Sequence, residues 1–184
     1  MRRVLIALLA LGLTAAAGAA TLAGVDVPDT ANVAGIDLAL NGAGLRTKFF
    51  MKIYVGALYA GQKSSDPDAL MAQSGPDRVL MHMIYAVSKE QFSDAWSGDF
   101  AANNPDSSDA IKDRIAQFIA YFGDSKKDDI ITIDYVPGQG TQISWNGSFR
   151  GNIPGEDFHK AFLKVFLGPK PPTGALKDGM LGKS

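Results

Sequence analysis

Few residues of this chain have the type and spacing to do chemistry, and an arginine and a tyrosine are the most informative of them. Arg46 presents a permanently charged fork of hydrogen-bond donors, and Tyr54 follows it by eight residues. On a neighbouring strand, the Tyr54 hydroxyl could point the same way and donate to an anion that the guanidinium binds. Each residue also has an ordinary interpretation, Arg46 as a surface arginine at a hairpin and Tyr54 as a strand aromatic.

The other residue types exclude several kinds of site. Cysteine is absent, and His82 and His159 are the only histidines. This composition excludes thiol catalysis and cysteine-ligated metals, and it argues against a His-rich metal site or a Ser-His-Asp triad. The glycines of the second half fall in expected hairpins rather than before a helix, so no phosphate cradle and no cofactor is expected. No basic cluster is dense enough to neutralise several phosphates, which excludes a nucleic-acid partner.

The amino terminus has the pattern of a cleaved secretory leader. A basic start at Arg2 and Arg3 precedes an apolar run over residues 4–13 and then small residues. Residues 17–19 fit the small-x-small cleavage pattern, which predicts processing after Ala19, with Ala20 as the second choice. A membrane anchor is the alternative, but the run is shorter than the roughly 20 residues that a spanning helix needs. We therefore expect a signal peptide over residues 1–19 and a periplasmic or secreted product without a stable membrane anchor.

Residues 20–184 have the length of one domain. Removal of Arg2 and Arg3 with the leader leaves 16 basic and 19 acidic residues, a net charge of −3. Because no disulfide can form, this domain must be stable through its hydrophobic core alone. The sequence does not predict its oligomeric state.

Apolar periodicity predicts strands, then helices, then a hairpin, then helices. The segment from 49 to 60 carries Lys52 as its only charge, so this strand is expected to be covered on both faces. Ser88 and Gln91 form a capping box that opens a helix. The expected strands cover residues 35–45, 49–60, 79–87, 130–135, 141–145 and 148–153, with a break at 42–44; the expected helices cover 66–73, 88–96, 111–122, 154–166 and 176–181. This order predicts an α+β domain with a large antiparallel sheet and helices on one face.

Three motifs carry a family resemblance when they are taken in order. Residues 41–46 (Asn-Gly-Ala-Gly-Leu-Arg) precede Lys-Ile-Tyr-Val-Gly-Ala-Leu-Tyr at 52–59; Trp-Asn-Gly follows at 145–147, with Gly at 151; and Phe-Leu-Gly-Pro-Lys-Pro-Pro-Thr at 166–173 leads to Leu at 181. This arrangement resembles the chalcone isomerase-like family, in particular its exported bacterial branch, over residues 24–182. The resemblance implies an open-faced β-sandwich, in which a helical layer covers the sheet and a cleft lies between them.

The resemblance also implies roles for three residues. Arg46 would project into the cleft, where it stabilises developing negative charge in the isomerases or holds a carboxylate in the fatty-acid binders. Tyr54 stands where the isomerases carry a Thr in a water-holding network. Thr173 stands where they place a Ser or Thr that contacts the substrate, although it equally fits the N-cap of a helix before Leu176.

Two departures from the isomerase pattern weaken the case for catalysis. Phe92 takes the place of a tyrosine that would orient the catalytic water. Asp99 lies near the position of an active-site asparagine, and its negative charge would repel a phenolate.

We therefore expect non-catalytic binding of a small amphipathic acid, such as a fatty acid, with Arg46 and Tyr54 on its carboxylate. The apolar wall would come from Phe49, Ile53, Met83, Phe118 and Phe122. One alternative is an intramolecular lyase of the chalcone isomerase type, acting on an enone with Arg46 as the electrophilic stabiliser. A second alternative is an interaction module whose cleft has collapsed.

Overall fold

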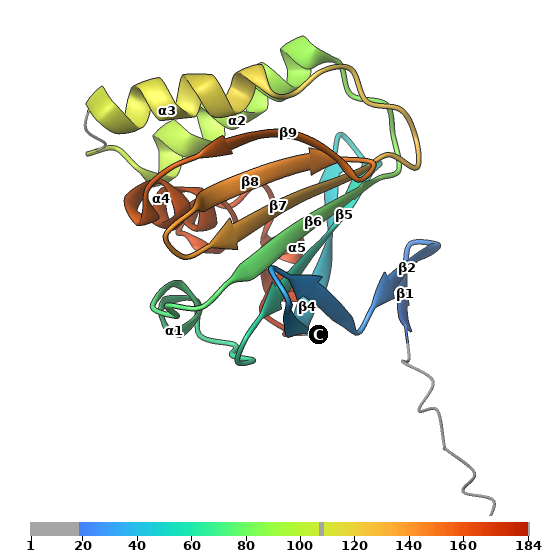
Figure 1. Cartoon of the computed structure of the whole chain (residues 1–184). Coiled ribbons are helices and arrows are strands. Elements are labelled where there is room, and N and C mark those ends of the chain that lie inside the picture. The colour runs from blue at the N-terminus through green and yellow to red at the C-terminus, as the bar shows by residue number, and fades with distance from the viewer. Residues whose placement is uncertain (1–18, 107–108, 184) are drawn as a thin grey trace, which may run out of the picture.

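The computed structural model describes residues 19–106 and 109–183 (Figure 1). All but the last residue of the expected leader lies outside these ranges. The expected cleavage points fall at the start of the first strand, so the leader stays a prediction. The strands are β1 (Ala19–Leu22), β2 (Val25–Pro28), β3 (Thr30–Val33), β4 (Ile36–Lys48), β5 (Met51–Ala60), β6 (Asp77–Met83), β7 (Ile130–Val136), β8 (Gly140–Trp145) and β9 (Ser148–Ile153). The helices are α1 (Pro67–Met71), α2 (Lys89–Asn103), α3 (Asp109–Ala120), α4 (Glu156–Leu167) and α5 (Gly174–Met180).

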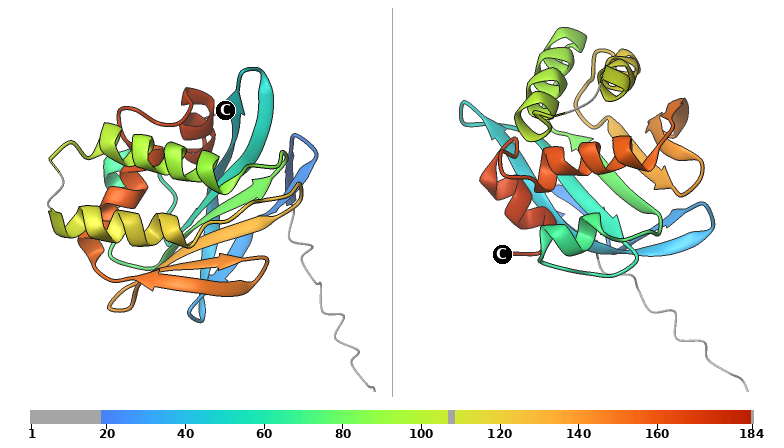
Figure 2. Two further views of the ribbon diagram at one scale, coloured as in Figure 1. Left: turned by 90° about the horizontal axis from the view of Figure 1, so that it is seen from above. Right: turned by 90° about the vertical axis from the view of Figure 1, so that its left-hand side faces the viewer.

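The described residues form one large antiparallel sheet and one small one. The large sheet has seven strands in the order β3-β4-β5-β6-β7-β8-β9, so each strand pairs with its neighbours along the chain. β1 and β2 form a separate hairpin. The helices α2 to α5 gather on one face of the large sheet (Figures 1 and 2). The predicted α+β architecture, a large antiparallel sheet with a helical layer, is confirmed. No helix of the described residues is both long and apolar enough to span a bilayer.

The space between sheet and helices is filled by aromatic side chains. The ring centroids of neighbouring pairs lie 5.0–6.2 Å apart, at tilted or edge-on angles that favour aromatic contacts. The cluster consists of Phe92, Trp96, Phe100, Phe118, Phe122, Trp145, Phe158, Phe162 and Phe166. The helical stripe that contains Phe118 and Phe122 is therefore core.

The opposite face of the sheet has a smaller core of its own. The sheet curls, so that β3 approaches β6 and side chains of β3, β4 and β5 share one cluster, to which the β1–β2 hairpin adds valines. Along β5, Tyr54 and Leu58 face the helices, whereas Val55 and Tyr59 face this second core. The prediction that this strand is covered on both faces is confirmed.

α5 lies against β4 at backbone distance. A Cβ atom on Gly44 would stand 2.7 Å from Leu176 Cα, and one on Gly42 would stand 2.7 Å from Gly182 N. The predicted strand break at residues 42–44 is wrong: β4 runs through both glycines, with register shifts between Leu40 and Gly42 and between Arg46 and Thr47. Glycine is needed here for the close approach of the helix, not for a turn.

Asn41 fixes this contact by hydrogen bonds. Its Nδ2 donates to the carbonyl oxygens of Met180 at 2.7 Å and Ser64 at 3.0 Å, and its Oδ1 accepts from the Ser64 N–H at 2.7 Å. One buried amide thus joins β4 to the end of α5 and to the loop before α1, and no polar atom of that amide is left without a partner.

Some ends of elements differ from the prediction. β6 stops at Met83 rather than at residue 87, because the N–H groups of Ile84 and Tyr85 both donate to the Ile53 carbonyl. The Ser88–Gln91 capping box is present, but α2 continues beyond Trp96 to Asn103. α4 begins at Glu156 rather than at residue 154.

The glycine contact predicts a sharp difference between two substitutions. Gly44→Ala should lower the free energy of unfolding by about 2–4 kcal/mol, because the new methyl group meets backbone that cannot rotate away. Gly98→Ala, on the open face of α2, meets no atom within 4 Å and should instead raise it by about 1 kcal/mol. Urea denaturation of both variants measures this, and equal effects would contradict the backbone contact.

Candidate functional site

A cavity of about 160 Å³ opens at the end of the sheet where β4 turns into β5. Its walls come from β4 and β5, from the segment after β6 and from the first turns of α2. Both charged and apolar side chains reach it, unlike the aromatic core beside it. The lining residues are Arg46, Lys48, Phe49, Met51, Ile53, Tyr54, Met83, Tyr85, Ala86, Val87, Gln91, Phe92 and Ala95.

Strand register brings Arg46 and Tyr54 together in this cavity. The two residues are direct partners across the β4–β5 pair, so their side chains emerge on the same face of the sheet. The Arg46 guanidinium carbon lies 5.6 Å from the centroid of the Tyr54 ring. The ring face holds the guanidinium by a cation–π contact, and the guanidinium also interacts with the Tyr54 hydroxyl. Because a guanidinium has five N–H donors, others remain for an anion.

Tyr54 is kept neutral by its surroundings. Its side chain is 2 % exposed, and burial raises the pKa of its hydroxyl to about 12, although the nearby Arg46 charge works in the opposite direction. At neutral pH the phenol therefore remains protonated and can donate a hydrogen bond. A neutral donor beside a permanent cation suits a carboxylate.

Asp99, on α2, supplies a negative charge close to this pair. Burial raises the pKa of its carboxyl group, and the charges of Arg46 and Lys48 lower it. Asp99 also acts to raise the Tyr54 pKa. It is not among the residues that line the cavity, so its influence on a bound anion is exerted through the electric field.

Comparison with known proteins identifies the fold around this cavity. The family model described as chalcone isomerase-like matches residues 19–182. The chain belongs to the chalcone isomerase-like family. Among solved structures, a fatty-acid binding protein of Arabidopsis thaliana is similar with a TM-score of 0.68 and 14 % identity, over 86 % of this chain and 92 % of the plant chain. At that identity the likeness shows the fold. The search of curated proteins found no match.

Only some of the residues that were expected to form the apolar wall line the cavity of this chalcone isomerase-like chain. Ile53, Met83 and Phe49 line it. Phe118 and Phe122 do not line it, because both are buried in the aromatic cluster between the layers. Phe92 separates the two regions: it lines the cavity, and its ring centroid lies 5.3 Å from that of Phe122.

Thr173 lies apart from the cavity. Its hydroxyl accepts a hydrogen bond from the Leu176 N–H at 3.2 Å and caps the N-terminus of α5. This is the N-cap interpretation of Thr173, and the residue is not among those that line the Arg46 cavity. A contact with ligand stays a prediction for this residue.

Sequence reasoning missed Lys48, a second cation on the cavity wall. Lys48 stands two residues after Arg46, and alternation along a strand puts such residues on the same face. The register shift between Arg46 and Thr47 interrupts this alternation. The turn at residues 49–50 also makes the end of the strand difficult to place from the sequence. Tyr85 was missed because the strand was expected to run past it.

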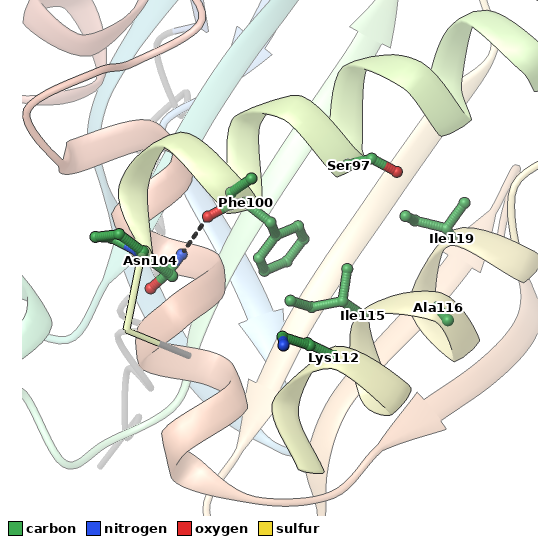
Figure 3. A pocket seen from close by; sticks show the side chains of 9 residues that line it. Ser97, Phe100, Asn104, Lys112, Ile115, Ala116 and Ile119 are labelled. Carbon is green, nitrogen blue, oxygen red and sulfur yellow. Dashed lines mark hydrogen bonds between the residues drawn. The ribbon is translucent and has the colours of Figure 1, made fainter. Parts of the chain in front are cut away.

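A second hollow lies between α2 and α3, with a volume of about 350 Å³ (Figure 3). Phe100, Ile115 and Ile119 form much of its surface, and the Asn104 amide donates to the Phe100 carbonyl at 3.2 Å. It is larger than the Arg46 cavity, but its lining contains no charged side chain paired with a buried hydroxyl. In the described part of the chain, no group of three or more His, Asp or Glu side chains could hold a metal ion.

The raised Tyr54 pKa predicts a loss of stability in alkali. A phenol with a pKa near 10 in the unfolded chain and about 12 in the folded one stabilises the fold fully below pH 10. As the pH rises from 10 to 12, about 2–3 kcal/mol of that stability is lost. Tyr54→Phe should therefore flatten the decline in unfolding free energy over this range, as measured by urea denaturation at a series of pH values. Superimposable pH profiles would show that the hydroxyl is accessible to solvent.

Proposed function

We propose that this protein binds a small amphipathic acid of the fatty-acid type, without chemistry, in the Arg46 cavity. The observation that carries the proposal is the register pairing of Arg46 with Tyr54 in a cavity whose other walls are largely apolar. A carboxylate placed there meets a charged fork and a neutral phenol donor. The printed name of the similar plant protein, a fatty-acid binding protein, supports the same ligand class.

The size of the cavity limits what the ligand can bury. About 160 Å³ is half of the smallest pockets that enclose a drug-sized molecule, and it is close to an engineered cavity that holds benzene. The carboxylate and the first carbons of a chain fit inside. The rest of a longer chain would lie over the exposed rim, where Phe49 and Tyr85 offer apolar surface.

The isomerase alternative is less well supported. Phe92, at the place of the tyrosine that the isomerases use, offers only hydrocarbon to the cavity. Asp99 sets a negative field where a phenolate would have to form. The Tyr54 phenol beside Arg46 can donate a hydrogen bond, but with a pKa of about 12 it does not act as a base near neutral pH.

The place of action proposed for this protein is outside the cytoplasm, as in the exported bacterial branch of the family. The support is the sequence of residues 1–19, in which a basic start is followed by an apolar run and then by small residues. The absence of cysteine is compatible with export, because a domain of this size can be stable without disulfides. A mature N-terminus at Ala20 or Thr21, read by mass spectrometry of the protein purified from its native cells, tests this.

Removal of the Arg46 charge should abolish the preference for an acid. We expect wild-type protein to bind a saturated carboxylic acid more tightly than the primary alcohol of the same length. Arg46→Met should weaken acid binding about tenfold to a hundredfold and leave alcohol binding unchanged, because only the acid makes the charge-assisted hydrogen bonds. Isothermal titration calorimetry over a series of chain lengths measures both.

Arg150→Gln is the matched control, because Arg150 is exposed and does not line the cavity. It should bind acid and alcohol as the wild type does. An Arg46→Met protein that still prefers the acid would exclude Arg46 as the carboxylate site. Cyclisation of a hydroxychalcone that depends on Arg46 would replace binding with catalysis.

Neutralisation of Asp99 should have the opposite effect. Asp99→Asn removes a negative charge from the field around Arg46 and should tighten acid binding about three- to tenfold. Asp94→Asn, on the exposed side of the same helix, should change it far less. If both variants strengthen binding equally, the effect comes from net charge and not from the site.

A further inference from the structure

The exposed apolar side chains of this protein gather at one end of the sheet. In an antiparallel meander alternate connections share an end, so the β4–β5 turn, the segments after β6 and before β7, and the β8–β9 turn lie in a row along one end of the sheet (Figure 1). The β4–β5 and β8–β9 turns are at the two extremes of that row (Figure 2). We call these residues, 48–52, 84–87, 123–130 and 146–150, the turn end. In the described part of the chain seven large apolar residues are exposed, and all except Ile36 belong to it: Phe49, Phe50, Met51, Tyr85, Ile130 and Phe149.

The β4–β5 turn is the most unusual part of the turn end. Lys48 pairs with Met51, so Phe49 and Phe50 are the two central residues of a tight hairpin turn, with φ values of 48° and 65°. Such turns favour Asn-Gly, because positive φ crowds a side chain. The two rings are 81 % and 103 % exposed, and apart from the Lys48 ammonium, 5.9 Å from the Phe49 ring centroid, little packing within the chain offsets the strain. The strain of this turn would be offset by a contact between the two rings and a surface outside the chain.

The turn end is basic although the chain as a whole is acidic. Its segments hold five basic residues, Lys48, Lys52, Lys126, Lys127 and Arg150, against three acidic ones, Asp124, Asp128 and Asp129. The whole chain has a net charge of −1. All five basic side chains are exposed. Long basic side chains beside protruding aromatic rings match the headgroup layer of an anionic bilayer, in which the rings enter the apolar boundary and the ammonium groups stay in water.

We propose that the turn end docks on a lipid bilayer with anionic headgroups and that the Phe49–Phe50 turn inserts into its interface. A protein partner is less well matched. Phe49 and Phe50 together can bury roughly 300–500 Å², whereas a stable protein interface buries about 800 Å² on each side. The other apolar residues stand on separate turns with lysines between them, a pattern that a deformable lipid surface fits more readily than a preformed protein surface.

This surface goes beyond ligand binding but adjoins it. Phe49, Met51 and Tyr85 belong both to the turn end and to the rim of the Arg46 cavity. Docking would therefore place the mouth of the cavity against the bilayer, where amphipathic acids reside. The docking itself needs no ligand and is tested without one.

Vesicle sedimentation with the mature protein tests the docking. We expect binding to vesicles of phosphatidylcholine and phosphatidylglycerol, with weaker binding at high salt. Phe50→Gly should reduce the partition coefficient about tenfold to a hundredfold, as expected when one buried phenyl group is lost. Because glycine suits the positive φ of Phe50, this variant should also be at least as stable as the wild type, so misfolding cannot explain the loss.

Two further proteins serve as controls. Ile36→Thr removes the exposed apolar residue at the opposite end and should bind vesicles as the wild type does. Phe50→Trp should be quenched by lipids brominated in their acyl chains, whereas Trp96 and Trp145, both buried, should not. Equal partition of wild type and Phe50→Gly, or an unquenched Trp at position 50, would overturn the proposal.

A variant of the ligand site separates this proposal from the proposed function. Arg46→Met should lose the preference for acids but retain vesicle binding, and Phe50→Gly should do the reverse, since Phe50 does not line the cavity. The lipid proposal would also be overturned if the wild-type protein did not bind vesicles. A purified protein that bound the wild type but not Phe50→Gly would then assign the turn to a protein partner.

Discussion

The arrangement of the site depends on the contact between α5 and β4, where a helix meets a strand with almost no side chain between them. Gly42 and Gly44 allow it, and the Asn41 amide ties the strand to the last turn of the helix. A helix held at that distance fixes the path of β4, and Arg46 follows two residues after the second glycine. The Asn-Gly-x-Gly-Leu-Arg motif is therefore one structural device: its first four residues dock a helix, and the position of its last residue follows from that docking. Any side chain at these glycines would move the strand that carries the charge.

Burial away from water shifts the protonation equilibria of the side chains around the site. Arg46 cannot lose its proton, whereas burial keeps the Tyr54 phenol neutral and opposes ionisation of Asp99. The cavity thus offers two cations, Arg46 and Lys48, and one neutral donor, and the carboxyl group of Asp99 lies near them. This combination suits an anion, because a permanent cation and a neutral donor both favour a negative charge beside them.

Local sequence patterns predicted the fold well and the cavity only in part. The capping box at Ser88 and the doubly covered strand β5 both follow from local sequence patterns. Phe118 and Phe122 were expected on the cavity wall but lie in the aromatic core. The path of β4 through its glycines was missed because the reason for those glycines lies about 135 residues away, in α5. Arg46 and Tyr54 were paired correctly because register in a hairpin is local. The filling of the interlayer space was beyond reach, since a list of aromatic residues is the same for a packed core and for an open cleft.

That filling also bears on the position of the site. The aromatic cluster fills the space between sheet and helices, and the Arg46 cavity lies beside it, next to the β4–β5 turn and the segment after β6. The rim of this cavity carries exposed apolar residues of the turn end. If a surface contact rearranges Phe49 or Tyr85, it must change the affinity of the cavity for its ligand. By thermodynamic reciprocity, the ligand must then change the affinity for the surface by the same factor. The proposed docking and the proposed binding would thus be coupled through these shared side chains, without a long-range conformational change.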